Sequence, residues 1–209
     1  MRDYRAWHDD YERPGSPLHL RLLVVRDLIA AALDERPPGA IRVISMCAGQ
    51  GRDLVTVGRQ HRRGADLIGR LVEIDRGNVD AARAAISEAG IPALEVVEGD
   101  AGQSDAYMGA SPADLVLACG IFGNVTDEDV KTTVEFMPAL CAPGAWVIWT
   151  RGPRGDGILD RIQNWFSDVG FEPRALVVGE GDLFGVGAAQ FQGHGREVHA
   201  GTRLFEFLR

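Results

Sequence analysis

Short apolar runs alternate with amphipathic stretches along most of the chain. In the amphipathic stretches, apolar residues recur three and four positions apart, which is typical of helices with one buried face. This spacing predicts helices over 17–35, 52–61, 76–90, 127–140 and 158–170. The apolar runs predict strands over 40–46, 67–75, 93–100, 113–120, 144–151, 173–179 and 202–209. Ser16 before Pro17 is typical of a helix start, and Gly90 of a helix end.

The alternation of strands and helices predicts an α/β fold, in which a mostly parallel sheet is covered by helices on both faces. The last two strands have no helix between them, so we expect them to pair antiparallel. No repeat, low-complexity linker or domain boundary divides the chain, and 209 residues favour a single domain. We therefore expect one doubly wound domain over 16–209, preceded by a polar and aromatic segment over 1–15.

Composition narrows the classes of partner. The chain carries 22 Lys and Arg against 30 Asp and Glu, a net charge of −8, which disfavours a broad electrostatic grip on a nucleic-acid backbone. Cys47, Cys119 and Cys141 have no metal-ligand spacing, and their odd number indicates reduced thiols in a cytoplasmic protein. No signal peptide and no long apolar run is visible, so we expect no membrane span. We also expect no metal.

Acidic residues and a glycine loop fall at the ends of three strands. The stretch VISMCAGQGRDL, residues 43–54, ends the first strand and carries Gly49 and Gly51, while Glu73 and Asp100 end the second and third. Ligands of open α/β sheets bind beyond the carboxyl ends of the strands. Glu73 follows Gly51 at the separation where a carboxylate accepts hydrogen bonds from a ribose. Asp100, one strand further, is placed to reach an adenine amino group.

Two nucleotide cofactors compete for this site. A nicotinamide dinucleotide needs a third glycine in the loop and places its pyrophosphate on the N-terminus of the following helix. Leu54 occupies the position of the third glycine, and Asp53 would repel a pyrophosphate. S-adenosylmethionine has no phosphate and ends in a cationic amino acid, so neither residue argues against it.

Four motifs in order carry a resemblance to a known family. Over about residues 16–209 the chain resembles the class I S-adenosylmethionine-dependent methyltransferases. VISMCAGQGRDL is similar to their first motif, LVEID to the acidic end of strand two, VEGDA to the end of strand three, and ADLVLACGIFGN to the fourth-strand motif. WFSDVGFEP resembles the approach to strand six. Ser45 and Cys47 depart from the pattern, since the family usually has an acidic residue and a glycine there.

The resemblance implies a seven-stranded sheet in the order 3-2-1-4-5-7-6 with strand seven antiparallel. It implies S-adenosylmethionine as cofactor and S-adenosylhomocysteine as product. Glu73 would contact the ribose, Asp100 and Ala101 the adenine, and residues 47–51 the methionine end, whose ammonium group Ser45 and Asp53 would share. The expected cofactor contacts are Ser45, Cys47, Ala48, Gly49, Gly51, Asp53, Glu73, Ile74, Asp75, Asp100, Ala101, Cys119 and Gly120. Asp75 fits equally well as the N-cap of the following helix.

The acceptor site must be argued from topology, because the family's motifs fix no catalytic residue. Loops after strands four and five reach the same edge of the sheet, with Phe122, Asn124, Arg151 and Arg154 as candidates to bind the acceptor. After strand six, residues 180–201 predict a long glycine-rich loop that would close over a substrate as a lid.

Three histidines are candidate general bases. His194 and His199 lie on the predicted lid, and His8 lies in the N-terminal segment. For His194 and His199 we favour the simpler interpretation of an exposed hairpin with incidental histidines. Residues 1–15, which include Tyr4 and Tyr11, are a candidate cover for the methyl donor, with a docked or frayed terminus as the equal alternative.

We therefore expect a methyltransferase that acts on an oxygen or nitrogen of a small molecule. The alternatives are an RNA or protein methyltransferase and a non-catalytic S-adenosylmethionine-binding protein. The net charge argues against RNA, and so does the absence of an Asn-Pro-Pro-Tyr type signature after strand four. An RNA site would show as a groove lined by Arg13, Arg21, Arg151 and Arg154. The oligomeric state stays open.

Overall fold

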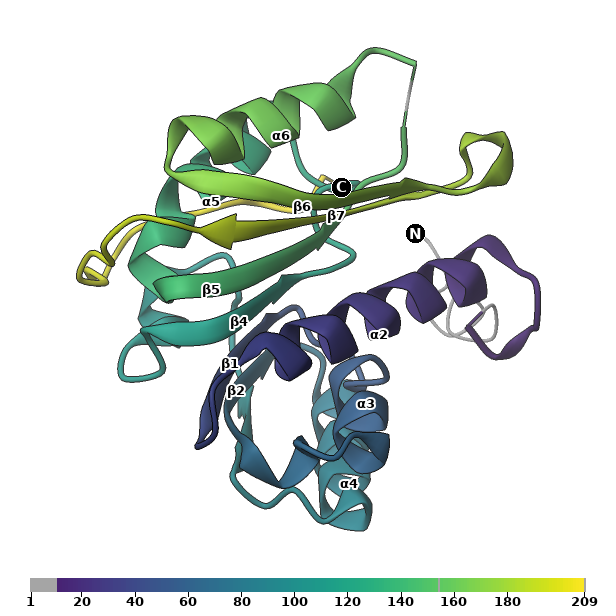
Figure 1. The fold of residues 1–209 in the computed structure, drawn as a ribbon, viewed down its shortest axis with the longest axis vertical. Coiled ribbons are helices and arrows are strands. Elements are labelled where there is room, and N and C mark those ends of the chain that lie inside the picture. The colour runs from purple at the N-terminus through teal and green to yellow at the C-terminus, as the bar shows by residue number, and fades with distance from the viewer. Residues whose placement is uncertain (1–10, 154, 209) are drawn as a thin grey trace.

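The computed structural model describes residues 11–153 and 155–208. Seven strands form one sheet in the order β3-β2-β1-β4-β5-β7-β6 (Figure 1). The strands are β1 (Ile41–Met46), β2 (Leu67–Glu73), β3 (Leu94–Glu98), β4 (Ala113–Ala118), β5 (Cys141–Thr150), β6 (Phe171–Val178) and β7 (Gly185–Phe191). The α-helices that cover them are α2 (Pro17–Glu35), α3 (Leu54–Gln60), α4 (Arg76–Ala89), α5 (Asp127–Leu140) and α6 (Ile158–Asp168).

The strand order and directions agree with the prediction. Strands β1 to β5 pair in parallel, whereas β7 runs antiparallel between β5 and β6. The carboxyl ends of β1, β2, β3 and β4 therefore lie together along one edge, which we call the carboxyl edge. The predicted bounds of the first six strands and of the helices differ from the observed ones by three residues or fewer.

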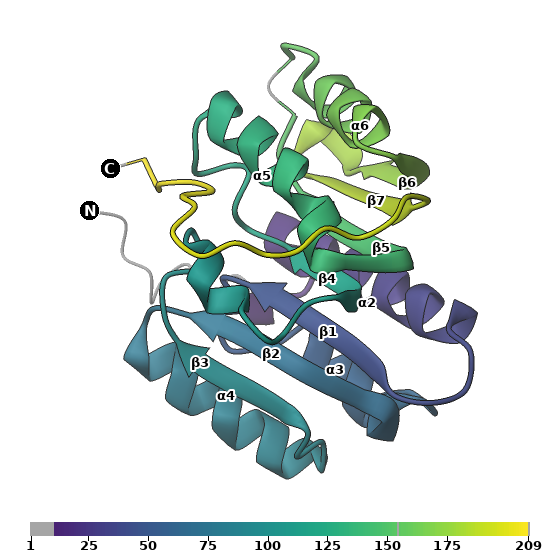
Figure 2. The same ribbon diagram turned by 90° about the vertical axis from the view of Figure 1, so that its left-hand side faces the viewer.

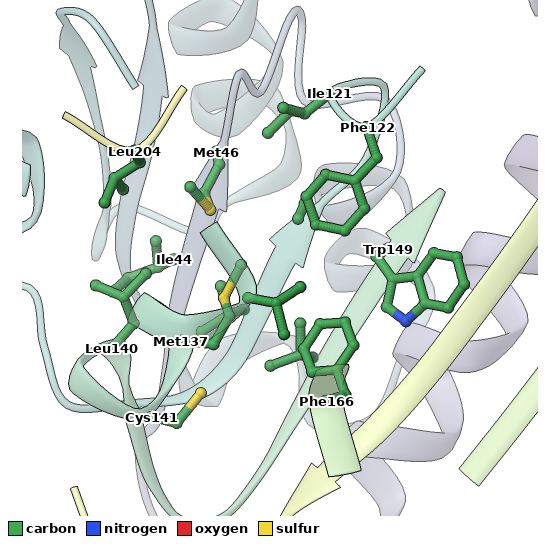
Figure 3. Close-up of a cluster of buried hydrophobic side chains, with 14 of the residues drawn as sticks. Ile44, Met46, Ile121, Phe122, Met137, Leu140, Cys141, Trp149, Phe166 and Leu204 are labelled. Atoms are coloured by element: carbon green, nitrogen blue, oxygen red, sulfur yellow. The ribbon is translucent and has the colours of Figure 1, made fainter. Parts of the chain in front are cut away.

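Helices cover both faces of the sheet, as expected. Helices α2, α3 and α4 pack on one face, and α5 and α6 on the other (Figures 1 and 2). Each face has its own apolar core. The core under α5 and α6 contains Met46, Phe122, Trp149 and Phe166, all almost completely buried (Figure 3). Burial of this much apolar surface on both faces stabilises the sheet and fixes its carboxyl edge.

The seventh strand is not where the sequence predicts it. β7 lies within the stretch expected to be a long loop, and glycine is required at position 187 because the Trp149 ring lies against it. A Cβ on Gly187 would fall 2.1 Å from that ring. The connection from β6 to β7 is therefore short and carries only the 3₁₀ helix η3 (Glu180–Asp182). The predicted lid over 180–201 is wrong, because Gly185–Phe191 within it form a strand inside the sheet.

Of the stretch predicted as strand seven, the structure describes residues 202–208, which instead cross the α5 side of the molecule (Figure 2). In its described part it forms one isolated bridge, between Arg203 and Gln103. The connection from β3 to β4 holds the 3₁₀ helix η2 (Ser104–Tyr107) and no α-helix. The segment after β7 packs there and buries Leu204 and Phe205 in the core, which accounts for its apolar pattern.

No helix within the described residues combines the length and the apolar character needed to cross a membrane.

Candidate functional site

The loop after β1 turns tightly at the carboxyl edge. Cys47, Gly49 and Gly51 all have positive φ, of 50°, 56° and 69°. The Gly51 N–H donates to the Ala48 carbonyl at 2.9 Å, and a Cβ on Gly51 would lie 2.9 Å from Val55, so glycine is strongly favoured. Cys47 adopts the left-handed conformation suited to the glycine usual in this motif. The departure at Cys47 therefore changes the side chain and leaves the course of the loop intact.

Glu73 is the last residue of β2 and joins two loops. Its Oε2 accepts a hydrogen bond from the Gly49 N–H at 2.7 Å, and its Oε1 accepts one from the Asp75 N–H at 2.8 Å. The residue is only 7% exposed, so these bonds hold the carboxylate in one orientation. A carboxylate oxygen has room for a second donor. Glu73 is thus a fixed acceptor at the centre of the carboxyl edge.

Asp75 and Asp100 both have structural partners. Asp75 is the N-cap of α4 and accepts from the Asn78 N–H at 2.9 Å. Asp100 accepts from the Gly102 N–H at 2.8 Å through Oδ1 and from Arg203 at 2.6 Å through Oδ2. The Arg203–Asp100 ion pair is half-exposed, and it attaches the C-terminal part of the chain to the end of β3.

A second group of polar residues surrounds the start of α3. Asp53 is the N-cap of α3 and accepts from the Leu54 N–H at 2.7 Å. Burial raises the pKa of the Asp53 carboxyl, against the opposing effect of Arg26 and Arg21. Arg21 donates to the Tyr11 hydroxyl at 2.6 Å. Burial also raises the pKa of Tyr11, and the nearby Asp53 adds to this shift. Tyr11, Arg21 and Asp53 thus form one cluster beside the glycine loop.

Asp53→Asn is expected to raise the melting temperature at neutral pH. Because the folded pKa is raised, the ionised carboxylate costs stability at neutral pH, and this cost disappears below the ordinary aspartate pKa, where both states are protonated. Asparagine removes the charge and keeps an N-cap oxygen. The gain should therefore shrink as the pH falls to about 4. Thermal unfolding of both proteins across this range measures it, and a variant less stable than wild type at neutral pH would contradict the assignment.

The thiols at the edge are neutral packing groups. Burial raises the pKa of Cys47 and of Cys119 far above its ordinary value. Arg21 acts in the opposite direction on the pKa of Cys119, but burial is the larger effect. A thiol with so high a pKa supplies little thiolate, so neither cysteine has the character of a nucleophile. Ser45, 2% exposed within β1, is also buried.

The three acceptor candidates that the structure describes do not form a common surface. Phe122 is fully buried, and its ring is tilted relative to that of Trp149, with the ring centroids 6.2 Å apart (Figure 3). Arg151 is buried too, and it donates to the Phe122 carbonyl at 2.5 Å and to Asp127 at 3.1 Å. Asn124 donates to the Gly120 carbonyl at 2.8 Å. Arg154 lies outside the described residues. Phe122 and Arg151 therefore support the edge from inside and offer no face to an acceptor.

Of the histidine candidates that the structure describes, His194 lies away from the glycine loop. His194 follows the end of β7, and because β7 is antiparallel this end lies at the edge opposite the carboxyl edge. The His199 carbonyl accepts from Ser104 of η2 at 2.7 Å. His8, and with it residues 1–10 of the candidate cover, falls outside the described residues, whereas Tyr11 lies near Asp53.

Two further side chains lie at this edge, and no sequence pattern predicts either of them there. Arg203 reaches Asp100 across 103 residues of chain, and Phe207 lines the same cleft as Ile74 and Asp100. Both lie in the segment predicted to be a strand, so its misassignment also hid them. Within residues 11–153 and 155–208, no three His, Cys, Asp or Glu side chains gather where they could hold a metal ion.

The strand order with an antiparallel β7, the glycine loop and the acidic strand ends define the class I S-adenosylmethionine-dependent methyltransferase fold. Magnesium protoporphyrin IX methyltransferase from Synechocystis, solved with S-adenosylmethionine bound, is similar to this chain at a TM-score of 0.68 and 11% identity, covering 90% of this chain and 91% of its own. No protein-family model matches the chain, and no curated protein matches it significantly.

Two further solved structures show how broadly this fold is used. An RNA methyltransferase from Salinibacter ruber, in complex with S-adenosylhomocysteine, has a TM-score of 0.55 and 19% identity, covering 88% of this chain and 97% of its own. An O-methyltransferase family protein from Burkholderia thailandensis has a TM-score of 0.64 and 16% identity, covering 83% of this chain and 56% of its own. At these identities the likeness establishes the fold, and the acceptors of these proteins differ in class.

Proposed function

We propose that this protein is an S-adenosylmethionine-dependent methyltransferase that acts on an oxygen or nitrogen of a small molecule. The observation that carries the proposal is the Glu73 carboxylate, which two backbone N–H groups from two different loops fix at the carboxyl edge. A carboxylate held in this way is suited to accept hydrogen bonds from the two hydroxyls of a ribose.

The residues around Glu73 fit the rest of the cofactor. On one side, Ile74 and Asp100 line a cleft of about 270 Å³ that is suited to the adenine. On the other side, the loop over 47–51 and the Asp53 carboxylate would hold the methionine end, where the ammonium and sulfonium groups are positive. Asp53 at the N-terminus of α3 disfavours a pyrophosphate there, which argues against a nicotinamide dinucleotide.

The bound cofactor supplies a methyl group that is already activated for displacement by its positive sulfur. An oxygen or nitrogen of the acceptor would form the new bond to the methyl carbon while the carbon–sulfur bond breaks, its electron pair stays on sulfur, and the proton of the acceptor is released to solvent. The chain's part is to hold donor and acceptor in line and to exclude water. Tyr11, which lies near Asp53 and Cys119, is placed to help to cover the donor.

Charge and burial support a small-molecule acceptor over RNA. Arg151, one of four arginines that would line an RNA groove, is 2% exposed and therefore unable to contact a phosphate backbone. The net charge of −8 opposes such a groove as well. The three free cysteines support the expected cytoplasmic location, since reduced thiols are usual there.

The acceptor class is tested by methyl transfer from S-adenosylmethionine labelled on its methyl group. Wild-type protein is incubated with a small-molecule cell extract, with total RNA and with extracted protein, and each is compared with a reaction that lacks the enzyme. We expect label only in the small-molecule fraction. Label in RNA or protein alone would contradict the acceptor class, and cofactor binding without transfer to any fraction would favour the non-catalytic alternative.

A further inference from the structure

The C-terminal segment, residues 202–208, ends at the carboxyl edge and is firmly attached there. The Leu204 N–H donates to the Gly102 carbonyl at 2.8 Å, and the Leu208 N–H donates to the Asn124 carbonyl at 2.8 Å. Arg203 pairs with Asp100 at 2.6 Å. Leu204 and Phe205 are each 1% exposed. The segment thus connects the end of β3, where Asp100 lines the cleft beside Glu73, to the loop after β4.

The cleft has apolar side chains on opposite elements. It is lined by Ile74, Asp100, Arg203, Phe205, Glu206 and Phe207. Ile74 follows Glu73 directly and is 68% exposed, and Phe207 is 46% exposed. Large apolar side chains with this degree of exposure are usually mobile. The Phe207 ring, however, packs edge-to-face with the buried Phe205 ring, and the two ring centroids are 5.5 Å apart. Phe207 therefore presents a supported aromatic surface to the cleft.

We propose that the C-terminal segment is part of the cofactor site, with Phe207 and Ile74 covering the faces of the adenine. This inference rests on the proposed function. The cleft favours a purine for three reasons. Ile74 and Phe207 line it beside the charged Asp100, Arg203 and Glu206; the Asp100 carboxylate, which already accepts from Gly102 and Arg203, has room for an amino group as a further donor; and the residue before Ile74 is the ribose candidate Glu73. A planar base between Phe207 and Ile74 would remove both side chains from water.

The test compares Phe207→Ala with Leu208→Ala in the full-length protein. Leu208 is the next residue, is 58% exposed and does not line the cleft, so its replacement controls for loss of an exposed apolar side chain. Calorimetric titration with S-adenosylhomocysteine should give at least fivefold weaker binding for Phe207→Ala, as expected when an aromatic partner of a base is removed. Leu208→Ala should stay within about twofold of wild type.

Two further measurements keep the outcomes distinct. Phe207→Tyr, which retains an aromatic ring, should bind within about threefold of wild type, and melting temperatures establish that every variant is folded. Wild-type binding with equal affinity for Phe207→Ala and Leu208→Ala would overturn this inference and leave the proposed function standing. No binding by wild type would overturn the proposed function and this inference with it.

Discussion

Glu73→Ala is expected to weaken S-adenosylhomocysteine binding by at least tenfold, which corresponds to about 1.4 kcal/mol. The alanine removes the acceptor for the ribose hydroxyls. It also frees the Gly49 and Asp75 N–H groups that the carboxylate now binds, so the two loops lose their common anchor. Hydrogen bonds to a charged group contribute about 1.5–3 kcal/mol each, so tenfold is the lower bound. Calorimetric titration at constant salt measures the change.

Glu98→Ala is the matched control for this prediction. Glu98 lies opposite Glu73 in the register between β2 and β3, but it is exposed and pairs with Arg76 at the surface. Its replacement removes the same charge from the same edge without touching the glycine loop. We expect an affinity within about twofold of wild type, because an exposed ion pair contributes little. Equal losses in the two variants would mean that net charge, rather than the ribose contact, accounts for the effect.

Arg151→Met is expected to lower the free energy of unfolding by about 3 kcal/mol. Arg151 is buried and donates to the Phe122 carbonyl and to Asp127. Methionine fills much of the same volume but leaves that carbonyl without its charged donor inside the protein, which is costly. Chemical denaturation followed by circular dichroism measures the loss.

Arg161→Met is the control that separates the effect of burial on stability from the effect of losing a positive charge. Arg161 binds the same carboxylate, that of Asp127, at 2.8 Å, but its side chain is 45% exposed. We expect a loss of less than about 1 kcal/mol, the usual contribution of a surface pair. A loss at Arg151 no larger than that at Arg161 would contradict the structural role that its burial indicates.

The sequence was sufficient to predict the parts of the fold that rest on local patterns. Ser16, Asp75 and Thr126 are helix N-caps in the structure, and capping chemistry is readable from a few neighbouring residues. The first six strands are apolar runs between helices, which is a strong signal. The position of Glu73 at the carboxyl edge could be predicted because it depends only on two consecutive βα units. Its partners, the N–H groups of Gly49 and Asp75, confirm that the strand ends meet.

The seventh strand was missed for a reason that lies in tertiary packing. Gly187 has no room for a side chain beside Trp149, and most of the strand is Gly or Ala, so Val186 and Phe191 are its only β-branched and aromatic residues and the strand signal is weak. The C-terminal segment was wrongly predicted to be a strand, because Leu204, Phe205, Phe207 and Leu208 make it an apolar run, although it packs on η2 rather than in the sheet. Arg203 and Phe207 were overlooked with it. Contacts between residues this far apart in the chain produce no local sequence pattern.

Arg151 shows that tertiary contacts also limit what the sequence predicts at the candidate site. An arginine after a strand on the carboxyl edge has the sequence pattern of a substrate ligand. Whether it points outward or inward depends on Asp127 and on the Phe122 carbonyl, which the sequence does not place.

The most direct test of the account is calorimetric titration of wild-type protein with S-adenosylhomocysteine, with NAD titrated under the same conditions. The account predicts micromolar binding of S-adenosylhomocysteine, about −8 kcal/mol, at one site per chain, and no measurable binding of NAD. Absence of S-adenosylhomocysteine binding, or binding of NAD in its place, would contradict it.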